Sequence, residues 1–229
     1  MYIFIFIVLF LIIIYKYCEK IQIYKNTISK ENINVLLIGG THGNEPAGSY
    51  ALMTFKETIN KFKNLNITII PKANKCGLKI NTRYLPHRLF NRDLNRNYKE
   101  SNYLTPSIEQ NIYNEVIKND IIIDLHEGYD FYKLNKRSIG STIFNNDKRL
   151  RDICIEITQD LNNNINDEYR KFTYLQEIVH NNNSMHLLCN KLNKTYILVE
   201  TSGQNNIQPL HTRVNQQLFI INKIMNYLS

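Results

Sequence analysis

The sequence predicts an α/β fold, with a mixed, largely parallel sheet flanked by helices. Short apolar runs that end at glycine, proline or a polar residue are typical of buried strands, and they occupy 35–38, 67–70, 121–125 and 195–199. Segments with helical spacing or helix-start signals lie between and after these runs, at 46–63, 106–118, 147–162 and 209–228. Strands that alternate with helices in this way indicate parallel strands joined by crossover helices.

Glycine and proline mark the first elements. Gly39 and Gly40 end the first apolar run, and Pro46 stands where the first helix is expected to begin. Pro71 closes the second run. Residues 72–103 show little periodicity, so we expect a long loop or several short turns there. Loops of that length in a compact domain are usually functional.

The later elements complete one domain. Pro106 is expected to open the second helix, and the strand at 121–125 follows it closely. The last helix carries apolar residues every three or four positions, namely Leu210, Val214, Leu218, Ile221 and Met225. The 229 residues show no internal repeat and no sign of a second domain, so residues 21–229 are predicted to form a single globular body.

Residues 1–20 are predicted to be a hydrophobic membrane anchor. Tyr2 to Tyr15 form an unbroken apolar and aromatic run of 14 residues. Extension through Cys18, with Lys16 snorkelling, approaches the roughly 17–20 residues that a spanning helix needs. The basic start and small-residue cleavage site of a signal peptide are not visible. A buried first strand or helix is the alternative interpretation.

Charge and cysteine usage suggest where the body would lie. Lysines follow the apolar run at positions 16, 20, 25 and 30, so the positive-inside rule predicts a cytosolic body behind the anchor. The four cysteines are Cys18, Cys76, Cys154 and Cys189. They contain no C-x-x-C pair, which favours free thiols in a reducing compartment over a disulfide framework or a cysteine-rich zinc site.

Composition leaves several function classes open. Hydrophobic residues make up 43% of the chain, which excludes a disordered protein. The net charge of +8, from 28 basic and 20 acidic residues, is compatible with nucleic acid or an anionic membrane but is a weak signal.

Candidate metal ligands follow two of the predicted strands. Ligands bind near the carboxyl ends of strands in sheets of this kind. His42 and Glu45 form H-x-x-E after the first strand, and His126 stands at the end of the third. Imidazole nitrogens and a carboxylate oxygen are good zinc ligands, and a catalytic zinc uses three protein ligands. The alternative is that His42 and Glu45 only cap the helix that begins at Pro46.

A cluster of arginines lies in the long loop. Arg88, Arg92 and Arg96 fall within nine residues, next to Asp93 and Asn95. Arginine can hold a carboxylate bidentately or polarise a carbonyl, and a neighbouring asparagine adds a donor. A solvated basic loop or a phosphate-contacting patch on nucleic acid is the alternative, although Asp93 argues against nucleic acid.

Glu200 closes the late strand after four apolar or aromatic residues, at 196–199. A carboxylate at the end of a buried strand is costly unless it has a partner or a role. It could serve as a general base with a raised pKa. An ordinary exposed strand end is the alternative.

Taken together, these stretches resemble a known family. The order G-G-T-H-G-N-E, D-L-N-R-N-Y, D-L-H-E and then E-T-S-G resembles the succinylglutamate desuccinylase/aspartoacylase group of carboxypeptidase A-like zinc hydrolases. The resemblance runs from about residue 33 to 228 and implies a phosphorylase/hydrolase-like α/β fold, with residues 21–229 as the catalytic domain. The chain ends about one helix after Glu200, so the C-terminal β-rich domain of aspartoacylases is not expected.

The resemblance implies which residues bind the metal. His42, Glu45 and His126 would bind one zinc ion per chain. Asp93 would orient His42 from the outer shell, where such partners fix the ring and its tautomer.

It also implies which residues act on the substrate. Asn95 and Arg96 would hold the free carboxylate of the substrate. Arg88 would polarise the scissile carbonyl, with Arg92 as the alternative, and Glu200 would be the general acid/base.

The function expected from this set is zinc-dependent hydrolysis of the amide bond of an N-acyl amino acid. The substrate partner would be a small N-acyl amino acid or a peptide with a free carboxylate, and no nucleic-acid partner is expected. Zinc would lower the pKa of bound water toward 7, and Glu200 would take its proton. Ester bonds are also possible substrates.

Two alternatives stay open. One is a metallocarboxypeptidase acting on peptide C-termini, which would use the same residues. The other is a non-catalytic, membrane-tethered binding module that contacts phospholipid or nucleic acid and needs no metal. A serine hydrolase lacks support because no G-x-S-x-G elbow is present.

Overall fold

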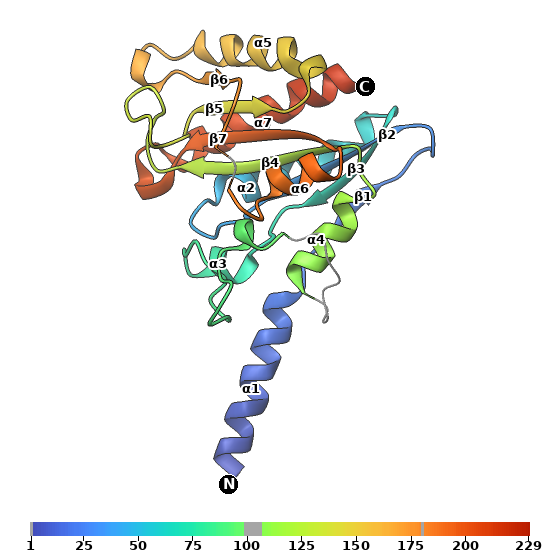
Figure 1. Ribbon diagram of the computed structural model, residues 1–229, viewed down its shortest axis with the longest axis vertical. Helices are drawn as coiled ribbons and strands as arrows, with labels where there is room; N and C mark the ends of the chain where they lie inside the picture. The colour runs from blue at the N-terminus through green and yellow to red at the C-terminus, as the bar shows by residue number, and fades with distance from the viewer. Residues whose placement is uncertain (1, 99–106, 180) are drawn as a thin grey trace.

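The computed structural model describes residues 2–98, 107–179 and 181–229. A seven-stranded sheet runs through the body in the order β1-β3-β2-β4-β7-β5-β6 (Figure 1). The strands are β1 (Tyr24–Asn26), β2 (Ile33–Gly39), β3 (Leu65–Ile70), β4 (Ile121–Gly128), β5 (Thr142–Asn145), β6 (Thr173–Leu175) and β7 (Thr195–Ser202). Strands β3, β2, β4 and β7 are parallel, whereas β1 and β5 pair antiparallel with their inner neighbours. This arrangement confirms the predicted mixed, largely parallel sheet.

Helices cover both faces of the sheet (Figure 1). They are α2 (Ala47–Phe55), α3 (Lys75–Lys79), α4 (Ile108–Val116), α5 (Arg151–Asn162), α6 (Met185–Lys191) and α7 (Leu210–Leu228). One buried cluster packs α2, α5 and α7 against one face, and a second packs α4 and α6 against the other. Side chains alternate along β2, so that Val35 and Leu37 enter the first cluster while Leu36 and Ile38 enter the second. Both faces of the central strands are therefore buried, as their apolar runs predicted.

Some elements differ from the sequence prediction. The helix expected at 46–63 is α2 followed by the 3-10 turn Lys56–Lys61, and the helix expected from Pro106 is α4, with Pro106 itself outside the described residues. Local patterns did not predict β1, β5, β6 or α6, which have three to seven residues each. Their positions depend on pairing with distant strands, such as β5 with β7, rather than on a long local period.

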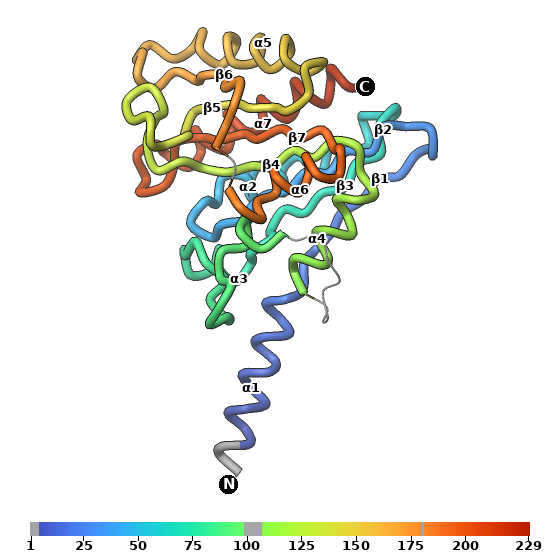
Figure 2. Tube along the Cα trace, viewed as in Figure 1, coloured from blue at the N-terminus to red at the C-terminus, as the bar shows by residue number. Residues whose placement is uncertain are grey.

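The N-terminal helix α1 (Tyr2–Glu19) extends away from the body (Figures 1 and 2). Across the part of the chain that the structure describes, no helix is both long and apolar enough to cross a membrane. The prediction that residues 1–20 anchor the body at a membrane is therefore wrong.

The last turn of α1 belongs to the body. Cys18 is buried and forms a disulfide with Cys76 in α3, whereas Cys154 and Cys189 are free and buried. The prediction of four free thiols is thus wrong for Cys18 and Cys76, which lie 58 positions apart and meet only through folding. Disulfides persist in oxidising surroundings, so the cysteines no longer support a cytosolic body.

A buried ion cluster also holds the end of α1. The Glu19 carboxylate accepts hydrogen bonds from Arg88 Nε, from Arg88 Nη2 and from the backbone N–H of Ile108. Nε2 of His87 lies 2.8 Å from Glu19 Oε1, and Arg88 also donates to Glu109. Burial alone raises the pKa of Glu19, but the hydrogen bonds from His87 and Arg88 outweigh it and lower the pKa to about 2.

Replacing Glu19 by glutamine is expected to destabilise the fold in a pH-dependent way. The folded-state pKa of about 2 lies below the ordinary 4.5, so Glu19 stabilises the fold fully above pH 4.5 and progressively less as the pH falls toward 2. Near neutral pH we expect a loss of roughly 1–3 kcal/mol in the free energy of unfolding, measured in urea. The gap between wild type and variant should close in acid, and a gap that stays constant would contradict this role. Exposed Glu31→Gln is the control.

Candidate active site

The predicted site residues meet at one edge of the sheet. The loop after β2 carries His42 and Glu45, whereas His126 lies in β4 and Glu200 in the neighbouring β7. Parallel pairing of β4 with β7 places His126 opposite Glu200 in register. Because the carboxyl ends of parallel strands share an edge, segments far apart in the sequence form one site there.

Close backbone packing fixes the loop that carries His42 and Glu45. Gly40 has a φ of 67°, in the left-handed region that favours glycine. A Cβ added to Gly43 would lie 2.0 Å from the carbonyl carbon of Gly77 in α3, so this position requires glycine. The contact between Gly43 and α3 holds the two candidate ligands on either side of it.

The side chains of His42, Glu45 and His126 converge on one point. Nδ1 of His42 lies 2.8 Å from Oε1 of Glu45, and Nδ1 of His126 lies 2.9 Å from Oε2. All three residues are buried, and one ligand atom from each lies within 4.8 Å of the others. Two imidazole nitrogens and a carboxylate oxygen form the donor set of a catalytic zinc site. The residues present therefore fit a single zinc ion.

The far nitrogen of each histidine faces an aspartate. Nε2 of His42 lies 3.2 Å from Oδ1 of Asp93, and Nε2 of His126 lies 3.1 Å from Oδ2 of Asp124. A carboxylate in this position fixes the ring orientation and tautomer of a metal-binding histidine. Both Nδ1 atoms are thereby directed at the common point. Asp93 was expected to orient His42, whereas Asp124 was given no role from the sequence although it stands inside the apolar run 121–125.

Glu200 lines the cleft beside these residues and is only 6% exposed. Burial raises the pKa of Glu200 well above its ordinary value, and the nearby carboxylates of Glu45 and Asp124 act in the same direction. A buried carboxylate that lines the cleft beside the candidate metal ligands is placed to exchange a proton with a bound water.

The candidate substrate-binding residues Asn95 and Arg96 line the same cleft, which has a volume of about 550 Å³. Asn95 Oδ1 accepts a hydrogen bond from the backbone N–H of Met185 in α6, and Arg96 Nη1 donates to the carbonyl oxygen of Asn95. Both side chains also carry N–H groups outside these two contacts. Together they could bind a carboxylate.

Arg88 and Arg92 do not line this cleft, which corrects the sequence prediction. Arg88 is held by Glu19 and Glu109, so its charge is already neutralised inside the body. Arg92 lies over the ring of Tyr84, 5.2 Å from its centroid, and is exposed.

Arg83 occupies the place expected for Arg88. Its Nη1 lies 3.3 Å from Nδ1 of His42 and 3.5 Å from Oε1 of Glu45, and its Nε donates to Asp93. Sequence reasoning missed Arg83 because it lies outside the arginine cluster of 88–96 and has no motif of its own. Only the fold of the loop shows which guanidinium reaches the site.

Three further residues support the site. Gln204 Nε2 donates to Glu45 Oε1 and to the carbonyl oxygen of Glu127, each at 2.7 Å. The buried Glu127 carboxylate accepts from the backbone N–H of Ala47 at the start of α2 and pairs with Arg213 of α7. Glu127 therefore ties two helices to β4 directly behind the candidate metal ligands.

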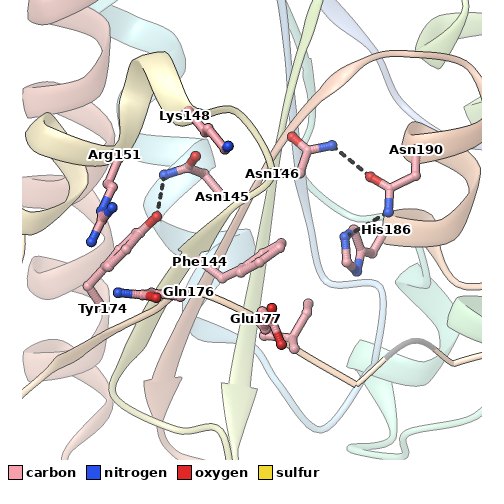
Figure 3. A pocket seen from close by; sticks show the side chains of 11 residues that line it. Phe144, Asn145, Asn146, Lys148, Arg151, Tyr174, Gln176, Glu177, His186 and Asn190 are labelled. Atoms are coloured by element: carbon pink, nitrogen blue, oxygen red, sulfur yellow. Dashed lines mark hydrogen bonds between the residues drawn. The ribbon is translucent and has the colours of Figure 1, made fainter.

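A second cavity of about 580 Å³ adjoins the cleft (Figure 3). The two share His186 and Ile178 in their walls. Figure 3 shows Lys148 and Arg151 on one side of this cavity and His186 with Asn190 on the other. The space next to the candidate site thus extends beyond the cleft itself.

An α/β sheet that presents a buried His-Glu-His donor set beside a carboxylate is the arrangement of a metal-dependent hydrolase. Residues 31–135 match the model of the Succinylglutamate desuccinylase/Aspartoacylase catalytic domain, which confirms the resemblance seen in the motifs. The match covers just under half of the chain and ends before Glu200. No curated protein sequence matches this chain.

Solved structures share the fold. The apo Cell Shape Determinant protein Csd4 from Helicobacter pylori aligns with a TM-score of 0.71 and 18% identity over 91% of this chain and 55% of Csd4. A second Csd4 structure, described as a D,L-carboxypeptidase bound to mDAP, aligns with a TM-score of 0.69 and 18% identity over 90% of this chain and 54% of that one. A proposed metallopeptidase from Shewanella amazonensis aligns with a TM-score of 0.69 and 17% identity over 91% and 82%. The present chain therefore spans about half of Csd4, and the likeness concerns the fold.

Proposed function

We propose that this protein is a zinc-dependent hydrolase that cleaves the amide bond of an N-acyl amino acid. The convergence of His42, Glu45 and His126 beside the buried Glu200 carries this proposal, because it joins a metal donor set to a proton acceptor in one cleft. A zinc ion held by the three ligands would supply Lewis acidity and would lower the pKa of a bound water molecule toward 7.

The remaining steps would be performed by side chains of the chain itself. Glu200 accepts a proton from the attacking water and returns it to the leaving nitrogen, a task that its raised pKa suits. Arg83 stabilises the negative charge that develops on the carbonyl oxygen. Asn95 and Arg96 hold the free carboxylate of the leaving amino acid and so orient the amide bond.

A carboxypeptidase that acts on short peptides is a second candidate. It is favoured by the size of the binding space, because the cleft of about 550 Å³ has a second cavity of about 580 Å³ beside it. An N-acyl amino acid would leave much of this space empty, whereas a peptide could extend into it.

A substrate panel would distinguish the two candidates. The full chain loaded with zinc would be assayed against N-acetyl and N-succinyl amino acids, and against tripeptides with free or amidated C-termini. Turnover of the N-acyl amino acids is the expected result. Turnover of free-carboxylate tripeptides alone would replace the deacylase by the carboxypeptidase, and equal turnover of amidated peptides would exclude a role for Asn95 and Arg96.

Two arginine variants are expected to behave oppositely. Arg83→Ala should lower kcat by about 10²–10³-fold, the usual effect of removing one donor to a developing oxyanion. Its loss of thermal stability should be smaller than that of Arg88→Ala, because Arg83 and its partner Asp93 are less buried. Arg88→Ala should lower the melting temperature, because it leaves Glu19 and Glu109 buried without their partner, while kcat stays within about twofold. Steady-state kinetics and thermal unfolding of both variants test this, and the reverse pattern would return the carbonyl-polarising role to Arg88.

A further inference from the structure

A chain of close contacts between buried side chains leads from Tyr196 to the candidate ligand His126. The Tyr196 hydroxyl donates to Oδ2 of Asp124 at 3.1 Å, and the same oxygen lies 3.1 Å from Nε2 of His126. All three residues are buried, with Asp124 at 0% and Tyr196 at 1% exposure. Nδ1 of His126, on the other side of the ring, is the atom that faces Glu45.

Asp124 depends on Tyr196 for its orientation. Oδ1 of Asp124 is buried without a hydrogen-bond partner among the described residues, whereas the contacts with Tyr196 and His126 both involve Oδ2. A buried carboxylate with one unsatisfied oxygen could rotate, because no other hydrogen bond fixes it. The Tyr196 hydroxyl therefore supplies the donor that sets which oxygen faces His126. Burial, together with the Asp124 charge, raises the pKa of Tyr196 well above its ordinary value, so the hydroxyl keeps its proton.

Aromatic packing holds the Tyr196 ring in turn. The ring of His186 in α6 stacks on Tyr196 with centroids 5.3 Å apart and an interplanar angle of 14°. Phe144 of β5 contacts the His186 ring edge-on, with centroids 4.9 Å apart. Residues from β5 and α6 thus restrain the ring that carries the Tyr196 hydroxyl.

We infer that Tyr196 is a positioning residue for the metal site, acting through Asp124 to hold His126 with its Nδ1 toward the metal. This inference deepens the proposed function and rests on its zinc site. Outer partners of metal-binding histidines typically change metal affinity by about 10–100-fold. Tyr196 is one contact further from the metal than Asp124 is, so its effect on zinc affinity should be smaller. This effect should vanish when Asp124 can no longer accept from both neighbours.

Zinc affinity of the full chain tests the inference without any need for catalysis. Metal-free protein would be titrated with zinc against a chromophoric chelator. Asp124→Asn is expected to weaken zinc binding by about 10–100-fold, and Tyr196→Phe, which keeps the stacked ring, by about fivefold. In the double variant, Tyr196→Phe should add less than about twofold to Asp124→Asn, because the tyrosine acts only through the aspartate. Tyr174→Phe, which loses a hydroxyl contact with Asn145 instead, is the matched control.

A cobalt spectrum separates positioning from a general loss of stability. The visible absorption bands of cobalt-loaded protein report ligand geometry, so Tyr196→Phe should shift them while Tyr174→Phe leaves them unchanged. Unaltered zinc affinity and unaltered cobalt absorption bands in Tyr196→Phe would overturn the inference. The same holds if Tyr196→Phe weakens zinc binding equally in the wild-type and Asp124→Asn backgrounds. A wild-type chain that binds no zinc would instead overturn the proposed function itself.

Discussion

Glu200→Gln is expected to lose about 10²–10⁴-fold in kcat while keeping its zinc, because the amide has the shape of the carboxylate but cannot accept a proton. In the structure this side chain lines the cleft, so the substitution alters a group that faces the reaction space. Stability should stay the same or rise slightly, since burial disfavours the charge of Glu200.

The controls for Glu200→Gln are a conservative exposed change and a metal assay. Glu31→Gln alters an exposed carboxylate and should leave kcat within about twofold. Zinc content would be measured on the same preparations. Retained activity in Glu200→Gln would show that another group transfers the proton, whereas loss of zinc along with activity would make Glu200 a support of the metal site.

His42→Ala is expected to abolish both zinc binding and hydrolysis. The ring supplies one of the three donor atoms, and it also connects Glu45 with Asp93 through contacts of 2.8 and 3.2 Å. Loss of a direct ligand should weaken zinc binding by more than the roughly 10–100-fold expected for an outer partner. Calorimetric zinc titration of the metal-free variant is the measurement.

A matched histidine variant controls for this change. His211 lies exposed on α7, away from the cleft lining, so His211→Ala should bind zinc as the wild type does. Zinc binding that survives in His42→Ala would place the metal elsewhere. A loss in both variants would indicate misfolding, which circular dichroism would reveal.

The sequence predicts the central strands because their apolar runs are long and sharply ended. Runs such as 35–38 and 121–125 lie in strands buried on both faces, where continuous hydrophobicity is the signal. The short strands β5 and β6 have only four and three residues, and their positions come from pairing with β7 and with each other. No local pattern contains that information.

The candidate site, like the sheet, could be predicted from the sequence only in part. His42, Glu45, His126 and Glu200 were predicted because they follow strand ends, whose shared edge the topology dictates. Arg88 was predicted and Arg83 was missed, because only the folded loop between β3 and α4 determines which arginine meets Glu19 and which meets Glu45. Likewise, the Cys18–Cys76 disulfide and the contact of Asp124 with Tyr196 join residues that are distant in the sequence.

Hydropathy alone did not predict the structural role of the N-terminal apolar run. Tyr2 to Tyr15 is apolar throughout, yet the described structure holds no helix that could cross a membrane. The end of this run is covalently and electrostatically joined to the body, through Cys18 and Glu19. Composition alone could not show these attachments, because each depends on a partner more than fifty residues away.

The zinc content of the purified full chain tests the central claim most directly. The protein would be loaded with zinc, dialysed against metal-free buffer and measured by inductively coupled plasma mass spectrometry. The convergence of His42, Glu45 and His126 predicts close to one zinc ion per wild-type chain and almost none in His42→Ala. A wild-type chain that retains no zinc, or a variant that retains as much as the wild type, would contradict the assignment of these residues as the metal site.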